Sequence, residues 1–174
     1  MDDDNEDDDE NEDDVSPDEI EFTQKISATI LHEMEWPFEA LLREYRRIEE
    51  EFVARAGDNK EVALDFKRRI SKQILGAALM TDQSHEVCRG IWEEVVERGF
   101  PDHETKRIHT GIYARCCQQN GEFDAGLAVL EPLITEMEQL HKGTALTSKE
   151  RKWYEKGVAT SRKIRDELKA GIRK

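Results

Sequence analysis

The sequence of 174 residues has no run of about 18 apolar residues, the length that a membrane-spanning helix requires. Its first residues are rich in Asp, where a secretory signal would need a basic region followed by an apolar one. Cysteine is scarce and odd in number, at three, which indicates free thiols in a reducing, cytoplasmic setting rather than a disulfide framework. A Gly-rich phosphate loop and a Gly-x-Ser-x-Gly motif are also missing, so two common enzyme signatures are absent.

Strand signals are equally scarce. Valine is infrequent and no segment alternates apolar and polar residues with period two, whereas Glu, Lys, Arg, Leu and Ala are plentiful. The chain is long enough for one domain of ordinary size with a single core. We therefore predict an all-α fold, with one domain in residues 16–174.

The formal net charge of −14 is concentrated at one end of the chain. Residues 1–22 hold 14 Asp and Glu and no Lys or Arg, and the remaining residues hold 26 of each sign. Residues 2–14 contain no apolar side chain, so they bury nothing that would offset the entropy lost on ordering. The composition predicts a disordered acidic tail over residues 1–15.

Apolar side chains recur three and four positions apart through most of the remaining chain, as amphipathic helices require. With the capping, Pro and Gly residues, this spacing predicts seven helices, over about residues 17–36, 37–57, 59–80, 84–99, 102–119, 123–140 and 148–173. Ser16-Pro17 opens the first helix, and Asp58 with Glu61 forms a capping box at the third. Helix pairs begin near residues 17, 59 and 102, a spacing of about 42 residues that is typical of stacked helical repeats.

The best-defined pair has small residues where its helices would cross, a Gly at the turn, an aromatic shortly after the turn and two later apolar core positions. These residues are Ala114, Gly126, Gly121, Phe123, Leu130 and Leu133. The pattern resembles the tetratricopeptide repeat (TPR). A second, partial copy lies 38 residues earlier, at Gly76, Leu79, Cys88, Trp92 and Val95, followed by Pro101.

This sequence also departs from the repeat pattern. The earlier copy has Gln83 and His85 at its turn, Pro132 lies inside the second helix of the better copy, and the repeat spacing exceeds the usual value of about 34 residues. HEAT-like stacking and an irregular bundle therefore remain alternatives. The resemblance covers residues 60–140 and implies about three antiparallel hairpins, stacked as a short solenoid, with a capping helix at residues 148–173.

The resemblance also implies a function. It indicates a non-catalytic protein–protein interaction module, such as an adaptor, chaperone or regulator, that binds a peptide or partner protein in a concave groove. The positions that it places toward the partner are Gln73, Ala77, Met80, Gly111, Arg115, Gln118 and Gln119. An unpaired Arg115 among amide side chains would suit the carboxylate end of a peptide.

Cysteine and histidine are the remaining candidates for chemistry. Cys116 and Cys117 are adjacent in a helix, so their side chains point about 100° apart and cannot share one ligand. We expect both, and Cys88, to be structural thiols buried between helices. His85 and Cys88 lie three positions apart, but a site of this kind needs four ligands, so we predict no metal, no cofactor and no enzyme activity. Two further histidines are expected to be solvated or half-buried, namely His103 and His109.

A second interpretation comes from charge at the C-terminal end. Residues 141–174 hold 11 Lys and Arg against four Asp and Glu. A basic helix can follow the phosphates of a nucleic acid, and the acidic tail would then be a competitor. The alternative is a solvated capping helix whose basic residues suit its C-terminal end. Nucleic-acid association therefore stands beside protein binding, and no membrane contact is predicted.

Overall fold

The computed structural model describes residues 16–33, 35–143 and 146–172. Within these residues all the regular structure is helical, so the prediction of an all-α fold is confirmed. The seven helices are α1 (Pro17–Ile30), α2 (Phe38–Ala56), α3 (Lys60–Met80), α4 (His85–Arg98), α5 (His103–Gln119), α6 (Phe123–Gly143) and α7 (Ser148–Ile172). None of the helices in this part of the chain is long and apolar enough to cross a membrane. The predicted acidic tail, residues 1–15, lies outside the described residues.

Most helices begin with a side chain that accepts a hydrogen bond from a backbone N–H of the first turn. Ser16 Oγ accepts from the N–H of Glu19 at 3.2 Å, as the sequence predicts. At α3 the cap is Asn59, whose Oδ1 accepts from the N–H of Val62 at 3.2 Å. The predicted capping box beginning at Asp58 is therefore wrong, because the cap is the residue directly before the first helical one.

The first helix is shorter than its sequence predicts. It ends at Ile30, and residues 31–33 and 35 form turns. The ring of Trp36 stacks on His32 with centroids 4.4 Å apart. Pro37 disfavours helical backbone at the residue before it, so the chain bends here before α2 begins. The predicted end near Trp36 is therefore too late.

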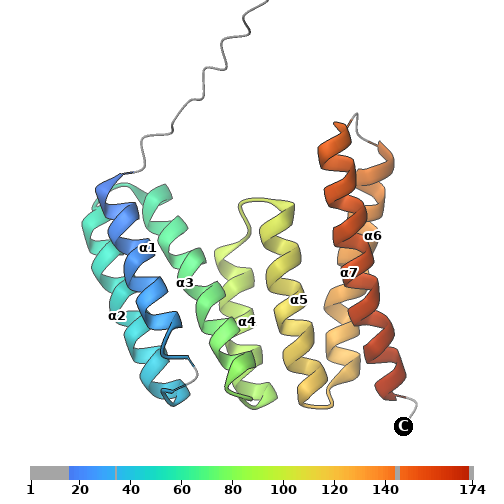
Figure 1. The fold of residues 1–174 in the computed structure, drawn as a ribbon, viewed down its shortest axis with the longest axis horizontal. Coiled ribbons are helices and arrows are strands. Elements are labelled where there is room, and N and C mark those ends of the chain that lie inside the picture. The colour runs from blue at the N-terminus through green and yellow to red at the C-terminus, as the bar shows by residue number, and fades with distance from the viewer. Residues whose placement is uncertain (1–15, 34, 144–145, 173–174) are drawn as a thin grey trace, which may run out of the picture.

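The helices lie side by side in chain order, with neighbouring helices antiparallel (Figure 1). Every helix packs against the next one along the chain, and α3, α5 and α7 also pack against one another in series. These odd-numbered helices form one layer with α1, whose Phe22 ring lies 4.7 Å from the Phe66 ring of α3, and the even-numbered helices form the other. All odd-numbered helices consequently begin at the same end of the molecule.

Two buried clusters hold the layers together, and we name them the N-terminal core and the C-terminal core. The N-terminal core joins α1 to α5 and contains the rings of Phe22, Phe52 and Phe66, whose centroids lie 4.7 to 5.4 Å apart. The C-terminal core joins α5, α6 and α7 and is aliphatic, with Leu130, Leu133, Ile134, Met137, Val158, Ile164 and Leu168. Helix α5 belongs to both, since Tyr113 lies in the first and Ala114 in the second.

The crossing of α5 and α6 explains one small residue. A Cβ atom on Gly126 would lie 3.2 Å from Cys117 Cβ and 3.1 Å from both terminal methyl groups of Leu168. Glycine therefore lets α5 and α7 approach α6 closely at this point. The resemblance pairs Gly126 with Ala114 as small crossing residues, and both are buried.

Candidate binding site

On α3, the structure places the three predicted partner-facing residues in different surroundings. Gln73 is half-buried and lines an open groove between α1 and α3, together with Ile26 and Ile30. Met80 is 57% exposed at the end of the helix. Ala77 is fully buried, so its prediction as a partner-facing residue is wrong. It continues the buried stripe of α3 instead of the exposed one, and its single methyl group does not reach the surface.

On α5, three of the four predicted residues face another helix. Arg115 forms an ion pair with Glu167 of α7, and it also donates to Gln118 Oε1 at 2.6 Å. A Cβ atom on Gly111 would be 3.7 Å from Ile164 Cδ1 of α7. The expectation of an unpaired arginine in an open groove is therefore wrong, because α7 packs on α5 as well as on α6. Gln119, at the end of the helix, is exposed.

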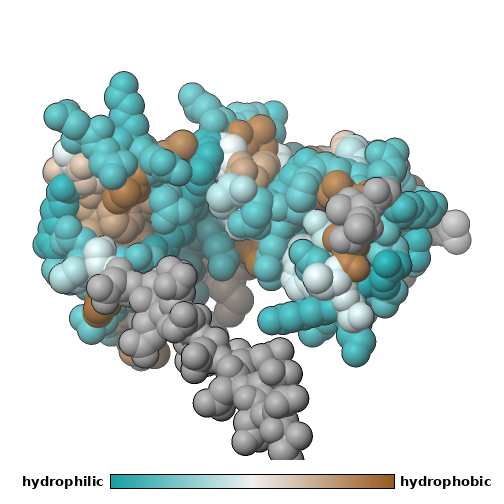
Figure 2. All heavy atoms as spheres, turned by 90° about the horizontal axis from the view of Figure 1, so that it is seen from above, coloured by the Kyte–Doolittle hydropathy of each residue, from teal (hydrophilic) through white to brown (hydrophobic). Residues whose placement is uncertain are grey.

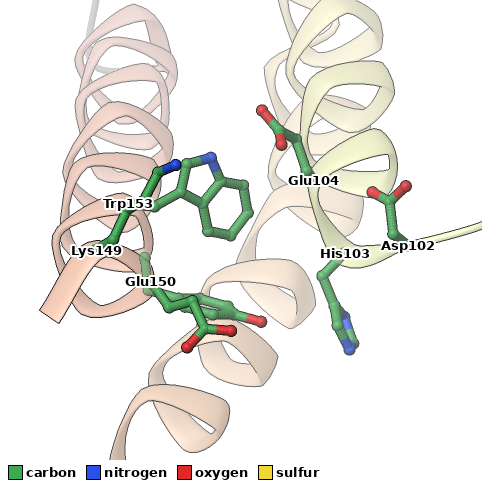
Figure 3. Close-up of a pocket in the computed structure, with 7 residues that line it drawn as sticks. Asp102, His103, Glu104, Lys149, Glu150 and Trp153 are labelled. Atoms are coloured by element: carbon green, nitrogen blue, oxygen red, sulfur yellow. The ribbon is translucent and has the colours of Figure 1, made fainter. Parts of the chain in front are cut away.

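A different opening lies between the starts of α5 and α7, and we call it the α5/α7 pocket. It has a volume of about 520 Å³ and is open to solvent. Figure 3 shows its lining, which consists of Asp102, His103 and Glu104 from the start of α5 and Lys149, Glu150, Trp153 and Tyr154 from the first turns of α7. Figure 2 views the end where both helices begin and shows hydrophobic residues in small separate patches among hydrophilic ones.

Aromatic side chains form the α7 wall of this pocket. Trp153 and Tyr154 meet edge to face, with centroids 4.8 Å apart and ring planes at 84°. The guanidinium of Arg107 lies 5.7 Å from the Trp153 ring. A Cβ atom on Gly157 would be 2.9 Å from Arg107 Cδ, so glycine leaves the room in which Arg107 lies. These contacts hold the indole in place while leaving it half exposed.

Most charged groups around the pocket already have partners. Asp102 accepts from the N–H of Thr105 at 2.6 Å, and the His103 ring lies 3.1 Å from Glu136. Glu150 accepts from the hydroxyl and the backbone N–H of Thr147, and these bonds hold the pKa of its carboxyl below the usual value.

Glu104 is the exception among the carboxylates. Within the described residues its carboxylate makes no hydrogen bond and no ion pair, and it is exposed. Figure 3 shows Glu104 extending from α5, and Trp153 from α7, into the space between the two helices. The pocket therefore presents an indole beside a carboxylate that is available to a ligand.

The three cysteines and His109 occupy buried positions, whereas His103 is exposed, in agreement with its prediction. All three thiols are buried and free, as predicted, and burial raises the pKa of Cys117 to about 11, so that it is protonated and unreactive near neutral pH. His109 is also buried, with Nδ1 2.8 Å from the carbonyl oxygen of Thr105, so the prediction of a solvated or half-buried ring is wrong for it. The ring of Phe100 lies beside it, with centroids 5.8 Å apart.

No cluster of three or more His, Cys, Asp or Glu side chains in residues 16–33, 35–143 and 146–172 is arranged to hold a metal ion. The sequence did not predict the α5/α7 pocket. Trp153 carries an apolar signal that suits a buried stripe, and nothing local shows that residue 104 lies opposite residue 153. Comparison of the chain with protein-family models, with curated proteins and with solved structures finds no significant match.

Proposed function

We propose that the protein is a non-catalytic interaction module that binds a basic segment of a partner protein in the α5/α7 pocket. The observation that carries this proposal is the half-exposed indole of Trp153 beside the carboxylate of Glu104, which has no partner in the described part of the chain. An open pocket with an aromatic wall and a few polar groups is the usual form of a recognition site. The proposal includes an adaptor, chaperone or regulator role, without enzyme activity.

A lysine or arginine side chain matches this geometry. Its aliphatic stem can lie along the indole, and its cation can reach both the ring face and the carboxylate of Glu104. Asp102 and Glu150 add negative charge to the rim, against one lysine, Lys149. Charge of this sign attracts basic segments and repels acidic ones, which gives selectivity as well as affinity.

The TPR-like solenoid is part of the same proposal. It is supported by hairpins that follow one another along the molecule and by odd-numbered helices that pack in series. It is supported also by Gly126 at the helix crossing, where Cys117 is the α5 contact, and by the burial of the small residue Ala114. In this arrangement α7 takes the position of a capping helix, and the open part of the concave surface is the groove lined by Gln73.

Titration with short peptides tests the binding proposal. We expect a lysine- and arginine-containing peptide to bind, and the same peptide with glutamine at those positions to bind at least about tenfold more weakly. Glu104→Gln should weaken the basic peptide by about tenfold because it removes the charge that the cation contacts. Glu86→Gln is the matched control, since Glu86 has the second position of α4, as Glu104 has of α5, and is also exposed.

Calorimetry or fluorescence anisotropy gives these affinities. The proposal is wrong if the wild-type protein does not distinguish the two peptides. It is also wrong if Glu104→Gln and Glu86→Gln change the affinity equally.

A further inference from the structure

Helix α7 carries a row of lysines on the side that faces away from the C-terminal core. The row consists of Lys149, Lys152, Lys156 and Lys163, all of them exposed. At 100° per residue these four positions fall within about 60° of one another around the helix axis, and they extend along about 21 Å. None of the four makes an ion pair within the described residues.

Most other basic residues in the described part of the chain form ion pairs with carboxylates. On α2, Arg46 binds Glu94 and Arg55 binds Glu21 at 2.7 Å. On α7 itself, Lys169 lies 2.7 Å from Glu131 of α6. The lysine row therefore stands out as a group of cations that the fold leaves uncompensated.

Two of the four acidic residues of α7 are paired with arginines, and the other two, Glu150 and Glu155, contact Thr147 and His141. Glu167 pairs with Arg115, whose hydrogen bond holds the pKa of the Glu167 carboxyl below its usual value. Asp166 lies 2.8 Å from Arg165. Between the lysines, Ala159 and Thr160 are exposed and short, so a flat surface can approach the row.

We propose that the lysine row binds the phosphate backbone of a nucleic acid. Phosphates of one DNA strand follow each other at about 3.4 Å along the helix axis, so the row spans about six of them. Lysines are flexible point charges that suit backbone contacts, so binding is independent of base sequence. A membrane surface fits less well, because the apolar face of α7 is buried against α5 and α6 and nothing is left to insert into lipid.

The test uses the full chain and fluorescence anisotropy with labelled nucleic acid of about 20 residues per strand, as duplex DNA in one arm and single-stranded RNA in the other. The variant carries Lys152→Gln, Lys156→Gln and Lys163→Gln. Lys149 is kept because it lines the α5/α7 pocket. The control variant carries Arg43→Gln, Lys60→Gln and Arg89→Gln, which removes three exposed charges from α2, α3 and α4.

For the wild-type chain we expect binding at about 50 mM salt that weakens steeply as salt rises. The lysine-row variant should lose at least about tenfold in affinity, and its slope of log affinity against log salt should be smaller by about two to three units. The control variant should keep both the affinity within about twofold and the slope within about one unit.

Three results would overturn the proposal. One is that the wild-type chain binds neither nucleic acid at low salt. Another is that both variants lose affinity and slope equally, which would show a general charge effect. The third is that vesicles containing phosphatidylserine retain the protein when nucleic acid does not. Since Glu104→Gln leaves the row intact and the lysine-row variant leaves Glu104 intact, failure of one proposal is distinguishable from failure of the other.

Discussion

The N-terminal and C-terminal cores bind their helices together by different means. Between α2, α3 and α4, a charged network lies beside the aromatic core. Arg98 donates to both carboxylate oxygens of Glu49 at 2.8 Å, to the Lys67 carbonyl at 2.6 Å and to Ser71 Oγ at 2.7 Å. In the C-terminal core, the buried residues of α6 and α7 are mainly aliphatic, and the ion pairs lie at the surface.

This difference shows how similar hairpins are specified differently. Helices α2 and α4 share no close backbone contacts in the described structure, yet two ion pairs connect them through side chains. Arg46 of α2 binds Glu94 of α4, and Arg98 of α4 binds Glu49 of α2. A buried ion pair fixes the relative position of two helices, because a charge separated from its partner is costly. An aliphatic contact tolerates small shifts of one helix against another. The C-terminal half, which relies on shape, also carries both proposed binding surfaces.

The largest expected effect comes from breaking the charged network. Arg98→Ala should lower the free energy of unfolding by about 2 to 3 kcal/mol, because the half-buried Glu49 would keep only Arg46, at 3.1 Å, and Ser71 and the Lys67 carbonyl would lose a donor. The control is Arg89→Ala on the same helix. Arg89 lies 3.8 Å from Glu93 at the surface, and its removal should cost less than about 1 kcal/mol. Denaturant unfolding measures both, and similar costs would show that the network contributes no more than a surface pair.

Effects of intermediate size on the free energy of unfolding, opposite in sign, are expected when two helical glycines are replaced by alanine. Gly126→Ala should destabilise the protein by about 1 kcal/mol or more, because the added methyl group would press on Leu168 and on Cys117. Gly76→Ala should stabilise it by about 0.5 to 1 kcal/mol, since nothing lies within 4 Å of the added methyl group and alanine favours the helix. Equal signs in thermal unfolding would mean that the packing of the C-terminal core adapts to one more carbon.

The smallest expected effect depends on pH. Burial holds the pKa of His109 below its usual value, so the folded protein keeps this ring neutral. As pH falls below about 6.5, the unfolded chain takes up a proton that the folded chain does not, and stability is lost. Between about pH 7.5 and 5.5 the wild-type protein should therefore lose more stability than His109→Gln.

The control for this prediction is His32→Gln, which removes a histidine from the turn after α1 and leaves the buried His109 ring in place. If His109→Gln has the same dependence on pH as the wild-type protein, burial of the neutral ring makes no contribution to it.

The sequence was sufficient for those features that depend on local spacing. Helix periodicity and caps such as Ser16 predict the element order, and Ala114 and Gly126 are correctly identified as small buried residues. Errors arise where another helix decides the outcome. The surroundings of Arg115 depend on α7, whose Glu167 lies some fifty positions later in the sequence. The burial of Ala77 depends on which face of α3 the neighbouring helices cover.

The candidate site could not be predicted for the same reason. Glu104 and Trp153 become neighbours only through the register of α7 on α5, and that register follows from the packing of the C-terminal core. The sequence shows that α7 is basic. Which of its cations form ion pairs depends on carboxylates of α6, such as Glu131 and Glu138.

The double membership of α5 has a consequence for how the chain is made. A chain that is synthesised from its N-terminus can complete the N-terminal core once α5 has emerged, before α6 and α7 exist. During that interval the side of α5 that later meets them is exposed, and it includes the small residues Gly111, Ala114 and Cys117 beside Arg115. These small residues offer little apolar surface for other nascent chains to adhere to. The incomplete chain on the ribosome therefore exposes little apolar surface on α5 before its last two helices are synthesised.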